Sequence, residues 1–218
     1  MTTVVSLPLS DGRFIVDGLV ATIRANRDQL SEIDAATGDG DHGINMAKGF
    51  ALCAERMDAE DVRGAGEAFE ALTMALMGDI GGSMGPLYGS FFLEFQLAFT
   101  GRDTLDAALF GQALAAGVAS VQELGSAKVG DKTLMDTLVP AEAAYRQTLA
   151  EGGDFIEALA AMSAAAERGK DSTKDMQARI GRAARLGERS IGTVDAGATS
   201  CFLILKSMAD SITRRLAP

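Results

Sequence analysis

Apolar residues recur every three or four positions along most of this sequence, and that spacing constrains the fold more than any other feature. The residues Leu105, Leu109, Leu114, Val118 and Val121, for example, would share one face of a helix. Segments that alternate polar and apolar residues, as half-buried strands do, are hard to find. The pattern therefore predicts an all-α protein of about eight amphipathic helices, without a clear strand.

The expected helix boundaries follow from prolines, capping residues and the ends of the apolar stripes. A proline is favourable in the first turn of a helix, so Pro86 is expected to begin the fourth helix. Thr104 is a candidate cap for the fifth helix, and Pro140 is expected to bend the sixth. The eight helices are expected at about residues 16–30, 44–57, 69–76, 86–95, 104–121, 131–149 and 154–176, and after residue 195.

Four of the connections between these helices are rich in glycine and aspartate, namely residues 34–43, 78–85, 125–130 and 179–197. The last has about 19 residues with little apolar periodicity, whereas connections between helices are usually short. Long loops of compact domains commonly carry function. Because no linker or internal repeat interrupts the chain, we expect residues 1–218 to form a single domain.

The charge of the chain restricts its partners. The formal net charge is −10, and both nucleic acids and anionic membranes attract basic surfaces, so neither is an expected partner. No run of about 18 apolar residues is present, so a membrane span is not expected. A phosphate ligand stays compatible with the charge, because a metal cation can bridge acidic residues to it.

Cysteine usage and the N-terminal segment indicate a cytoplasmic protein. Cys53 and Cys201 are far apart in the sequence, which is typical of two reduced, buried thiols. The segment Met1–Pro8 lacks the basic and apolar stretches of a signal peptide.

Asp34, Asp39 and Asp41 form the sharpest local signal. These carboxylates lie within eight positions, next to glycines that permit a tight backbone. Hard cations such as Mg²⁺ bind several oxygen ligands at close range, and a cation would offset the repulsion between the carboxylates. The run indicates either a Mg²⁺ site or a solvated acidic turn. It is not an EF-hand, because the later ligands and the closing glutamate are absent.

Two neighbouring features suit an anionic ligand without requiring one. His42, the only histidine, could contact a ligand together with Asn45, although a histidine at a helix start more often has a local partner. The glycine-rich segment 81–85 precedes a helix, where free backbone N–H groups can bind an anion. An ordinary glycine-rich connector would look the same.

Residues Gly125–Thr133 come close to a nucleotide-binding P-loop but do not match it. Asp131 separates Gly130 from Lys132, and the segment follows a helical pattern instead of a strand. Any nucleotide must therefore be held by other groups. The arginines of the long connection suit phosphate recognition, although surface salt bridges are the commoner role. They are Arg179, Arg182, Arg185 and Arg189.

Taken together, five motifs in this order resemble the L-subunit family of bacterial dihydroxyacetone kinases, which is equivalent to the C-terminal domain of the single-chain kinases. The motifs are Gly38–Met46, Gly81–Gly89, Gly130–Thr133 with Pro140, Gly181–Gly192 and Asp195–Ser200. The resemblance covers nearly the whole chain. It implies a closed barrel of eight antiparallel helices with a nucleotide and Mg²⁺ on loops at one end.

Carried over residue by residue, the resemblance also implies the site. Asp34, Asp39 and Asp41 would ligate two Mg²⁺ ions. ADP or ATP would be lined by His42, Gly43, Ile44, Asn45, Ser83, Met84, Gly125, Leu134, Arg182, Asp195, Ala196 and Gly197. The chain departs from the family pattern at Met84, Ala184, Arg185 and Ala196, where Ser, Ser-Tyr and Pro are usual. These departures touch the phosphate-facing loops and leave the aspartates intact.

The implied activity is phosphoryl transfer to a hydroxyl of a short ketose, such as dihydroxyacetone or erythrulose. The family's K subunit would bind the ketose, so this chain would be active only with that partner. A phosphotransferase-system phosphocarrier, the M subunit, would be a further partner if bound ADP is recharged in place; the alternative is exchange for ATP. Two other functions stay open: a metal-dependent phosphohydrolase, and a non-catalytic ADP-binding partner or regulator.

Overall fold

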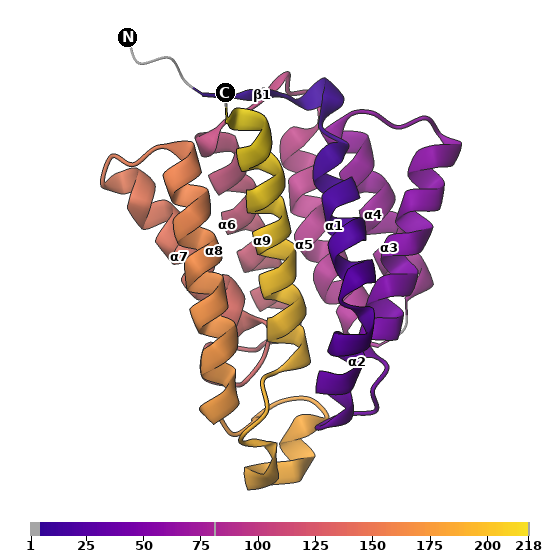
Figure 1. Ribbon diagram of the computed structural model, residues 1–218, viewed down its shortest axis with the longest axis vertical. Helices are drawn as coiled ribbons and strands as arrows, with labels where there is room; N and C mark the ends of the chain where they lie inside the picture. Colours follow the sequence, from indigo (N-terminus) through magenta and orange to yellow (C-terminus); the bar gives the residue numbers. More distant parts are fainter. Residues whose placement is uncertain (1–4, 81, 218) are drawn as a thin grey trace.

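The computed structural model describes residues 5–80 and 82–217, which form nine α-helices (Figure 1). They are α1 (Phe14–Ala25), α2 (Arg27–Ala35), α3 (His42–Ala59), α4 (Ala65–Asp79), α5 (Met84–Phe99), α6 (Ala107–Gly125), α7 (Met135–Ala150), α8 (Phe155–Ser172) and α9 (Ala196–Leu216). Two-residue strands β1 (Leu7–Pro8) and β2 (Thr104–Leu105) pair in antiparallel fashion. The expectation of an all-α protein is confirmed. Residues 1–4 of the N-terminal segment and Gly81 of the glycine-rich connection lie outside the described residues.

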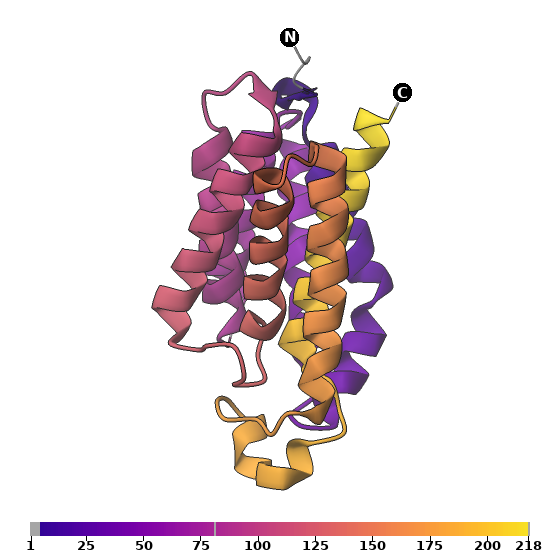
Figure 2. The same ribbon diagram turned by 90° about the vertical axis from the view of Figure 1, so that its left-hand side faces the viewer.

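Contacts between the long helices close a ring. In order around it, α1 contacts α3, each helix from α3 to α8 contacts the next, and α9 contacts both α8 and α1. Connections reverse the chain at each end, so neighbouring helices of the ring run antiparallel (Figures 1 and 2). This is the arrangement that the expected barrel of eight helices requires, with α2 as an addition beside α3 and α9.

Aromatic side chains fill the inside of this ring. Phe69, Phe95, Phe110 and Tyr145, from four successive helices, are buried and contact one another in series. Their ring centroids are 5.4, 5.6 and 5.3 Å apart, within the range that aromatic pairs prefer. The core is therefore closed by packing of these aromatic rings. Among the described helices, none is both long and apolar enough to cross a bilayer.

The expected first helix is two helices. Apolar residues continue in register from Ile23 to Leu30, but the backbone leaves the helical region at Asn26 (φ −105°, ψ 9°). The side-chain amide of Asn26 donates to the carbonyl of Thr22 at 2.8 Å and so occupies a helical carbonyl near the end of α1. The break gives α2 its own direction, and Asp34 lies in its last turn.

Two other expected helix starts are wrong, because hydrogen bonds in each place hold the residues before the helix in a strand or a loop. Thr104 belongs to β2, and the fifth of the expected helices is capped by Asp106, whose carboxylate accepts the N–H of Leu109 at 2.8 Å. The sixth begins at Met135, not near Asp131.

The reason for the later start of α7 is the carboxylate of Asp136. It accepts the N–H of Thr133 at 2.7 Å and that of Gly130, which folds the preceding residues into a loop.

Pro86 is the third residue of α5, which begins at Met84.

Up-and-down order brings alternate connections to the same end of the ring. The four connections rich in glycine and aspartate are those between α2 and α3, α4 and α5, α6 and α7, and α8 and α9. They meet at the lower end in Figure 1, the last of them in yellow-orange below the helices. Topology alone therefore gathers segments that are far apart in sequence into one candidate site.

Candidate functional site

The connection between α2 and α3 is a tight turn that two glycines permit. Gly40 has a left-handed backbone (φ +77°), which glycine adopts without strain. A Cβ at Gly38 would lie 2.5 Å from Oδ1 of Asp34, so the position has little room for a side chain. The turn therefore places Asp39 and Asp41 beside Asp34.

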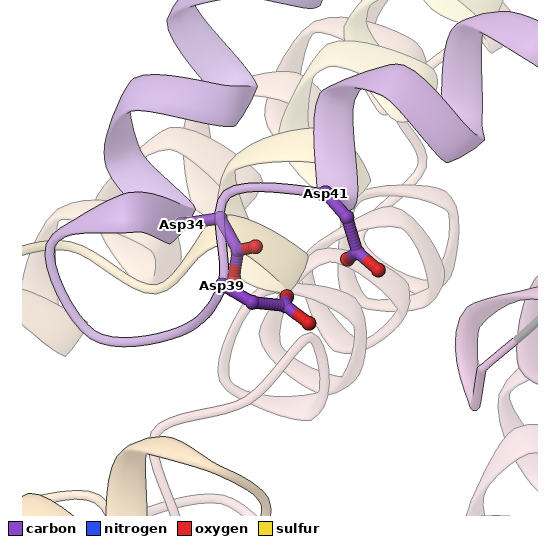
Figure 3. A group of neighbouring side chains, drawn as sticks. All are labelled: Asp34, Asp39 and Asp41. Atoms are coloured by element: carbon purple, nitrogen blue, oxygen red, sulfur yellow. The ribbon is translucent and has the colours of Figure 1, made fainter.

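The three aspartates lie together on this turn (Figure 3). Each offers a carboxylate oxygen, and these oxygens are all within 4.8 Å of one another. Asp34 is half-buried and accepts the backbone N–H of His42 at 3.3 Å, whereas Asp39 and Asp41 are exposed. Two oxygens on opposite sides of one Mg²⁺ lie about 4 Å apart, so small side-chain rotations suffice for coordination. The donor set fits a hard divalent cation.

A guanidinium from another connection faces this acidic turn. Arg182 forms an ion pair with Asp39 through its Nη1 atom. Both side chains are about half exposed, at 58% and 48%, so the pair by itself adds little stability. Its effect is positional, because it brings the connection between α8 and α9 across to the aspartates.

These groups border a cavity of about 610 Å³, a size typical of small-ligand sites. One side of the cavity is polar and carries the aspartates, Asn45 and Arg182. The other side is apolar and is made by α5, α6 and the residues before α7: Leu87, Val121, Leu124, Ala127 and Leu134. A ligand with a charged part and a flat apolar part matches this division.

Two helix N-termini also open onto the cavity. Ser83 and Met84 start α5, and Ala196 and Gly197 start α9. Backbone N–H groups at such ends are unpaired within the helix and favour anions. Asp195 caps α9 by accepting the N–H of Ala198 at 2.7 Å, and burial raises the pKa of this carboxyl to about 6.

The imidazole of His42 is held by a hydrogen bond to a buried side chain. Its Nε2 is 2.9 Å from the hydroxyl oxygen of Ser200, which is 2.7 Å from the hydroxyl of Tyr88. Burial lowers the pKa of His42 to about 4, so the imidazole is neutral at pH 7. Tyr88 also donates to the carbonyl of Gly197 at 3.1 Å. This network ties the starts of α3 and α9 to α5, and His42 still borders the cavity.

The structure brings together most of the residues expected at the site. Gly43 and Ile44 differ: Gly43 packs on α2, where a Cβ would lie 2.0 Å from the carbonyl oxygen of Arg27, and Ile44 is half exposed. Neither borders the cavity. The residues that do are Asp34, Asp39, Asp41, His42, Asn45, Ser83, Met84, Gly125, Leu134, Arg182, Asp195, Ala196 and Gly197.

Apart from Leu134, the residues of the apolar wall were not expected at the site from the sequence. Val121 belongs to an apolar stripe of the sequence and Leu87 lies one residue after Pro86, yet both border the cavity where α6 ends and α5 begins. Leu124 could have been identified from the sequence, because it is an apolar residue directly before Gly125. In the structure it lies at the end of α6 and is 57% exposed. Lys132 was also missed, and it borders the cavity although it is buried.

A larger hollow of about 1200 Å³ lies at the opposite end of the ring, next to β1. Its lining mixes arginines such as Arg63 and Arg102 with acidic residues such as Glu67 and Asp103. Charges of both signs surround it without a cluster aimed at one point. Size alone would select this hollow, but the grouping of carboxylates, arginine and helix N-termini selects the smaller cavity.

Comparison with known proteins gives results that agree with this geometry. The family model described as the DAK2 domain matches residues 36–210. The chain is 38% identical over 180 residues to the ADP-binding subunit DhaL of the PEP-dependent dihydroxyacetone kinase of Escherichia coli (strain K12), covering 83% of this chain and 86% of that protein.

Two longer proteins match over one part of their length. The L-erythrulose 1-kinase of Mycolicibacterium smegmatis is 36% identical over 197 residues, which cover 87% of this chain and 33% of that protein. The solved dihydroxyacetone kinase of C. freundii in complex with AMP-PNP and Mg²⁺ is 27% identical, with a TM-score of 0.69, over 97% of this chain and 36% of that one.

Proposed function

This chain belongs to the DAK2 domain family, and we propose that it is the ADP- or ATP-binding subunit of a kinase that phosphorylates a short ketose. The observation that carries the proposal is the cavity itself. Three carboxylates and Arg182 border one side, an apolar wall borders the other, and two helix N-termini open between them. A nucleotide with its phosphates toward the aspartates fits this division.

Within this proposal, each wall has a separate task. The apolar wall holds the base by burial, while Asn45 and the starts of α5 and α9 bind phosphate oxygens. Asp34, Asp39 and Asp41 hold Mg²⁺, which neutralises phosphate charge during transfer. Two ions are proposed, as the family resemblance implies, and phosphate oxygens would supply further ligands.

Arg182 has two proposed partners. Its guanidinium compensates Asp39 when it contacts that carboxylate, and it turns to the phosphates once a cation takes over that role. Phosphoryl transfer requires positioning and charge stabilisation more than covalent chemistry, so these groups suffice for the donor half of the reaction.

The groups that bind and activate the ketose, the phosphoryl acceptor of the reaction, are proposed to lie on a separate K subunit. His42, the one histidine of the sequence, is neutral and bonded to Ser200, so it is committed to the protein interior. The half-buried carboxylate of Asp195 is committed to capping α9. Neither is free to activate a ketose hydroxyl, which favours a partner that brings both the ketose and its base.

How the nucleotide is recharged depends on a further partner. The Escherichia coli relative is named PEP-dependent, which supports rephosphorylation of bound ADP by a phosphotransferase-system M subunit. Exchange of ADP for ATP is the alternative. The likeness to an L-erythrulose 1-kinase keeps erythrulose beside dihydroxyacetone as a substrate.

The departures from the family pattern leave the proposed site intact. Ala196 is the first residue of α9, a position where proline is also favourable, so the helix start does not depend on the exchange. Met84 borders the cavity at the start of α5, where the backbone N–H groups do not depend on the side chain. Arg185 is exposed on the connection between α8 and α9.

Activity with and without a K subunit tests the proposed function. The chain alone, given ATP, Mg²⁺ and dihydroxyacetone or erythrulose, is expected to form no ketose phosphate, and addition of a K subunit is expected to start turnover. A coupled assay that measures ADP release checks this. Hydrolysis of ATP by the chain alone would indicate a phosphohydrolase. Mg-ADP binding without any turnover beside a K subunit would indicate a regulator.

Replacement of one carboxylate tests the metal site. Asp41→Asn is expected to abolish measurable Mg-ADP binding in calorimetry while the helical circular dichroism spectrum is retained, because Asp41 is exposed and supports no core contact. Asp28→Asn, an exposed aspartate of α2 outside the cavity, is the matched control and should bind as the wild type does. Unchanged affinity in Asp41→Asn would remove Asp41 from the metal site.

Replacement of the guanidinium tests the role of Arg182. Arg182→Ala is expected to weaken Mg-ADP binding by about 1.5 kcal/mol, the lower end for a hydrogen bond to a charged group, because the side chain is half exposed. Arg185→Ala, three residues away in the same connection, should change the affinity far less. Equal losses in the two variants, measured by calorimetry, would contradict a specific phosphate contact.

A further inference from the structure

Lys132 is the most deeply buried charged side chain that the proposed function leaves without a task beside the cavity. It is 2% exposed, and it has a left-handed backbone (φ +62°), which is rare for a residue other than glycine. Such a conformation costs on the order of 1 kcal/mol or more and persists where the surrounding structure requires it. The contacts of its ammonium group show what that requirement is.

The ammonium group of Lys132 makes three hydrogen bonds, all to one segment of the chain. Its Nζ donates to the backbone carbonyl oxygens of Met176 at 3.1 Å, Thr193 at 2.7 Å and Ser190. An ammonium has three protons, so these bonds satisfy it without a ligand. All three acceptors lie in residues 176–193, which we call the cover segment, and it is this segment that carries Arg182.

The cover segment has almost no apolar interior of its own. From residue 174 to residue 195, all of which the structure describes, only Ala178 and Ser190 are buried. Ser190 is itself a polar anchor, since its hydroxyl accepts the N–H of Ala178 at 2.9 Å and donates to the carbonyl of Gly187 at 2.7 Å. Hydrogen bonds to Lys132 therefore replace the hydrophobic contacts that normally hold a segment in place.

The loop that holds Lys132 is fixed mainly by its own aspartates, and it also contacts the cover segment where the carbonyl of Asp131 accepts the N–H of Arg179 at 3.2 Å. Asp136 accepts the N–H groups of Gly130 and Thr133 on either side of it, and Asp131 accepts the N–H of Lys128 at 3.0 Å. Burial lowers the pKa of Lys132, while the nearby carboxylates of Asp195 and Asp175 raise it and favour the charged form. A rigid loop thus presents a cation to three carbonyls of a segment that lacks a core.

We propose that Lys132 is a positioning residue whose ammonium clamps the cover segment over the cavity and thereby sets how slowly a bound nucleotide leaves. The inference rests on the proposed nucleotide site and deepens it. Arg182 lies between the clamped carbonyls of Met176 and Ser190, so the clamp holds its guanidinium at the acidic turn. Lys132 acts on the ligand through this segment and not by direct contact.

The sequence offers a competing role, because a lysine next to a glycine-rich turn resembles a phosphate-binding lysine. The two roles make different predictions for the protein without nucleotide. A clamp holds the cover segment whether or not a ligand is present, whereas a phosphate-binding lysine leaves that segment unchanged until a phosphate arrives. Hydrogen–deuterium exchange of peptides from residues 176–193 in the nucleotide-free protein separates them.

The test uses Lys132→Met, which keeps an unbranched side chain one heavy atom shorter than lysine and removes the ammonium charge. We expect amide exchange in the cover segment to rise on the order of tenfold or more without nucleotide, and ADP to dissociate faster by a similar factor in the presence of Mg²⁺. Lys174→Met, an exposed lysine at the edge of the same connection, is the charge-matched control and should leave both rates unchanged.

A second variant covers the case in which Lys132→Met fails to fold. Lys132→Gly accepts the left-handed backbone and leaves space where the side chain was. Added propylammonium should then restore slow exchange of the cover segment, whereas sodium chloride at the same ionic strength should not. Such rescue depends on a cation at the three carbonyls, and a merely structural loss of packing would not show it.

Three results would overturn the proposal. The first is wild-type exchange of the cover segment in Lys132→Met, the second is a loss of ADP affinity without any change in that exchange, and the third is the absence of rescue in a folded Lys132→Gly. Failure of the wild type to bind Mg-ADP would instead overturn the proposed function. The exchange measurement without nucleotide would still decide whether Lys132 clamps the segment.

Discussion

Repulsion among three carboxylates on one short turn is the constraint around which this end of the molecule is arranged. Asp34, Asp39 and Asp41 place oxygens within 4.8 Å of one another, which is unfavourable unless positive charge compensates it. Glycines permit the turn, and Arg182 brings a guanidinium to it from the connection between α8 and α9. The aromatic core has closed the ring of helices without these groups, so the acidic turn is free to serve a ligand.

Features of the fold and the site could be predicted from the sequence where the residues that cause them lie close together in the chain. Helices with long apolar stripes and the aspartate turn were predicted, because both depend on residues close together in the chain. The break at Asn26 was missed, since the stripe runs through it and only a side-chain bond to the backbone marks it. The cap was predicted at Thr104 and lies at Asp106, because the pairing of Thr104 with β1, distant in sequence, cannot be seen locally. For the same reason Leu124 was not predicted at the site: whether it is inside the ring depends on where its helix ends.

The connection between α8 and α9 shows how a segment without apolar residues can be ordered. Its sequence has little apolar periodicity that could hold it. Polar bonds join its two ends instead: the backbone N–H of Asp195 donates to the hydroxyl of Thr173 at 2.9 Å, and that of Gly192 donates to the carbonyl of Lys174 at 2.7 Å. Bonds of this kind are directional and exchange with water more readily than apolar contacts, which agrees with the proposal that this segment covers the ligand site.

The central claim is that the aspartates bind a cation and that the cation, in turn, makes a phosphate ligand acceptable at an acidic site. A thermal melt in four conditions tests it most directly: the protein alone, with Mg²⁺, with ADP and a chelator, and with Mg²⁺ and ADP together. A ligand at about 1,000 times its dissociation constant stabilises by roughly 4 kcal/mol, and each kcal/mol moves the melting point of a domain near this size by about 2–4 °C. The account predicts a joint shift on the order of 10 °C, with small shifts from either component alone. If ADP with chelator stabilises the protein as much as Mg-ADP does, the aspartates are not metal ligands and the account is contradicted.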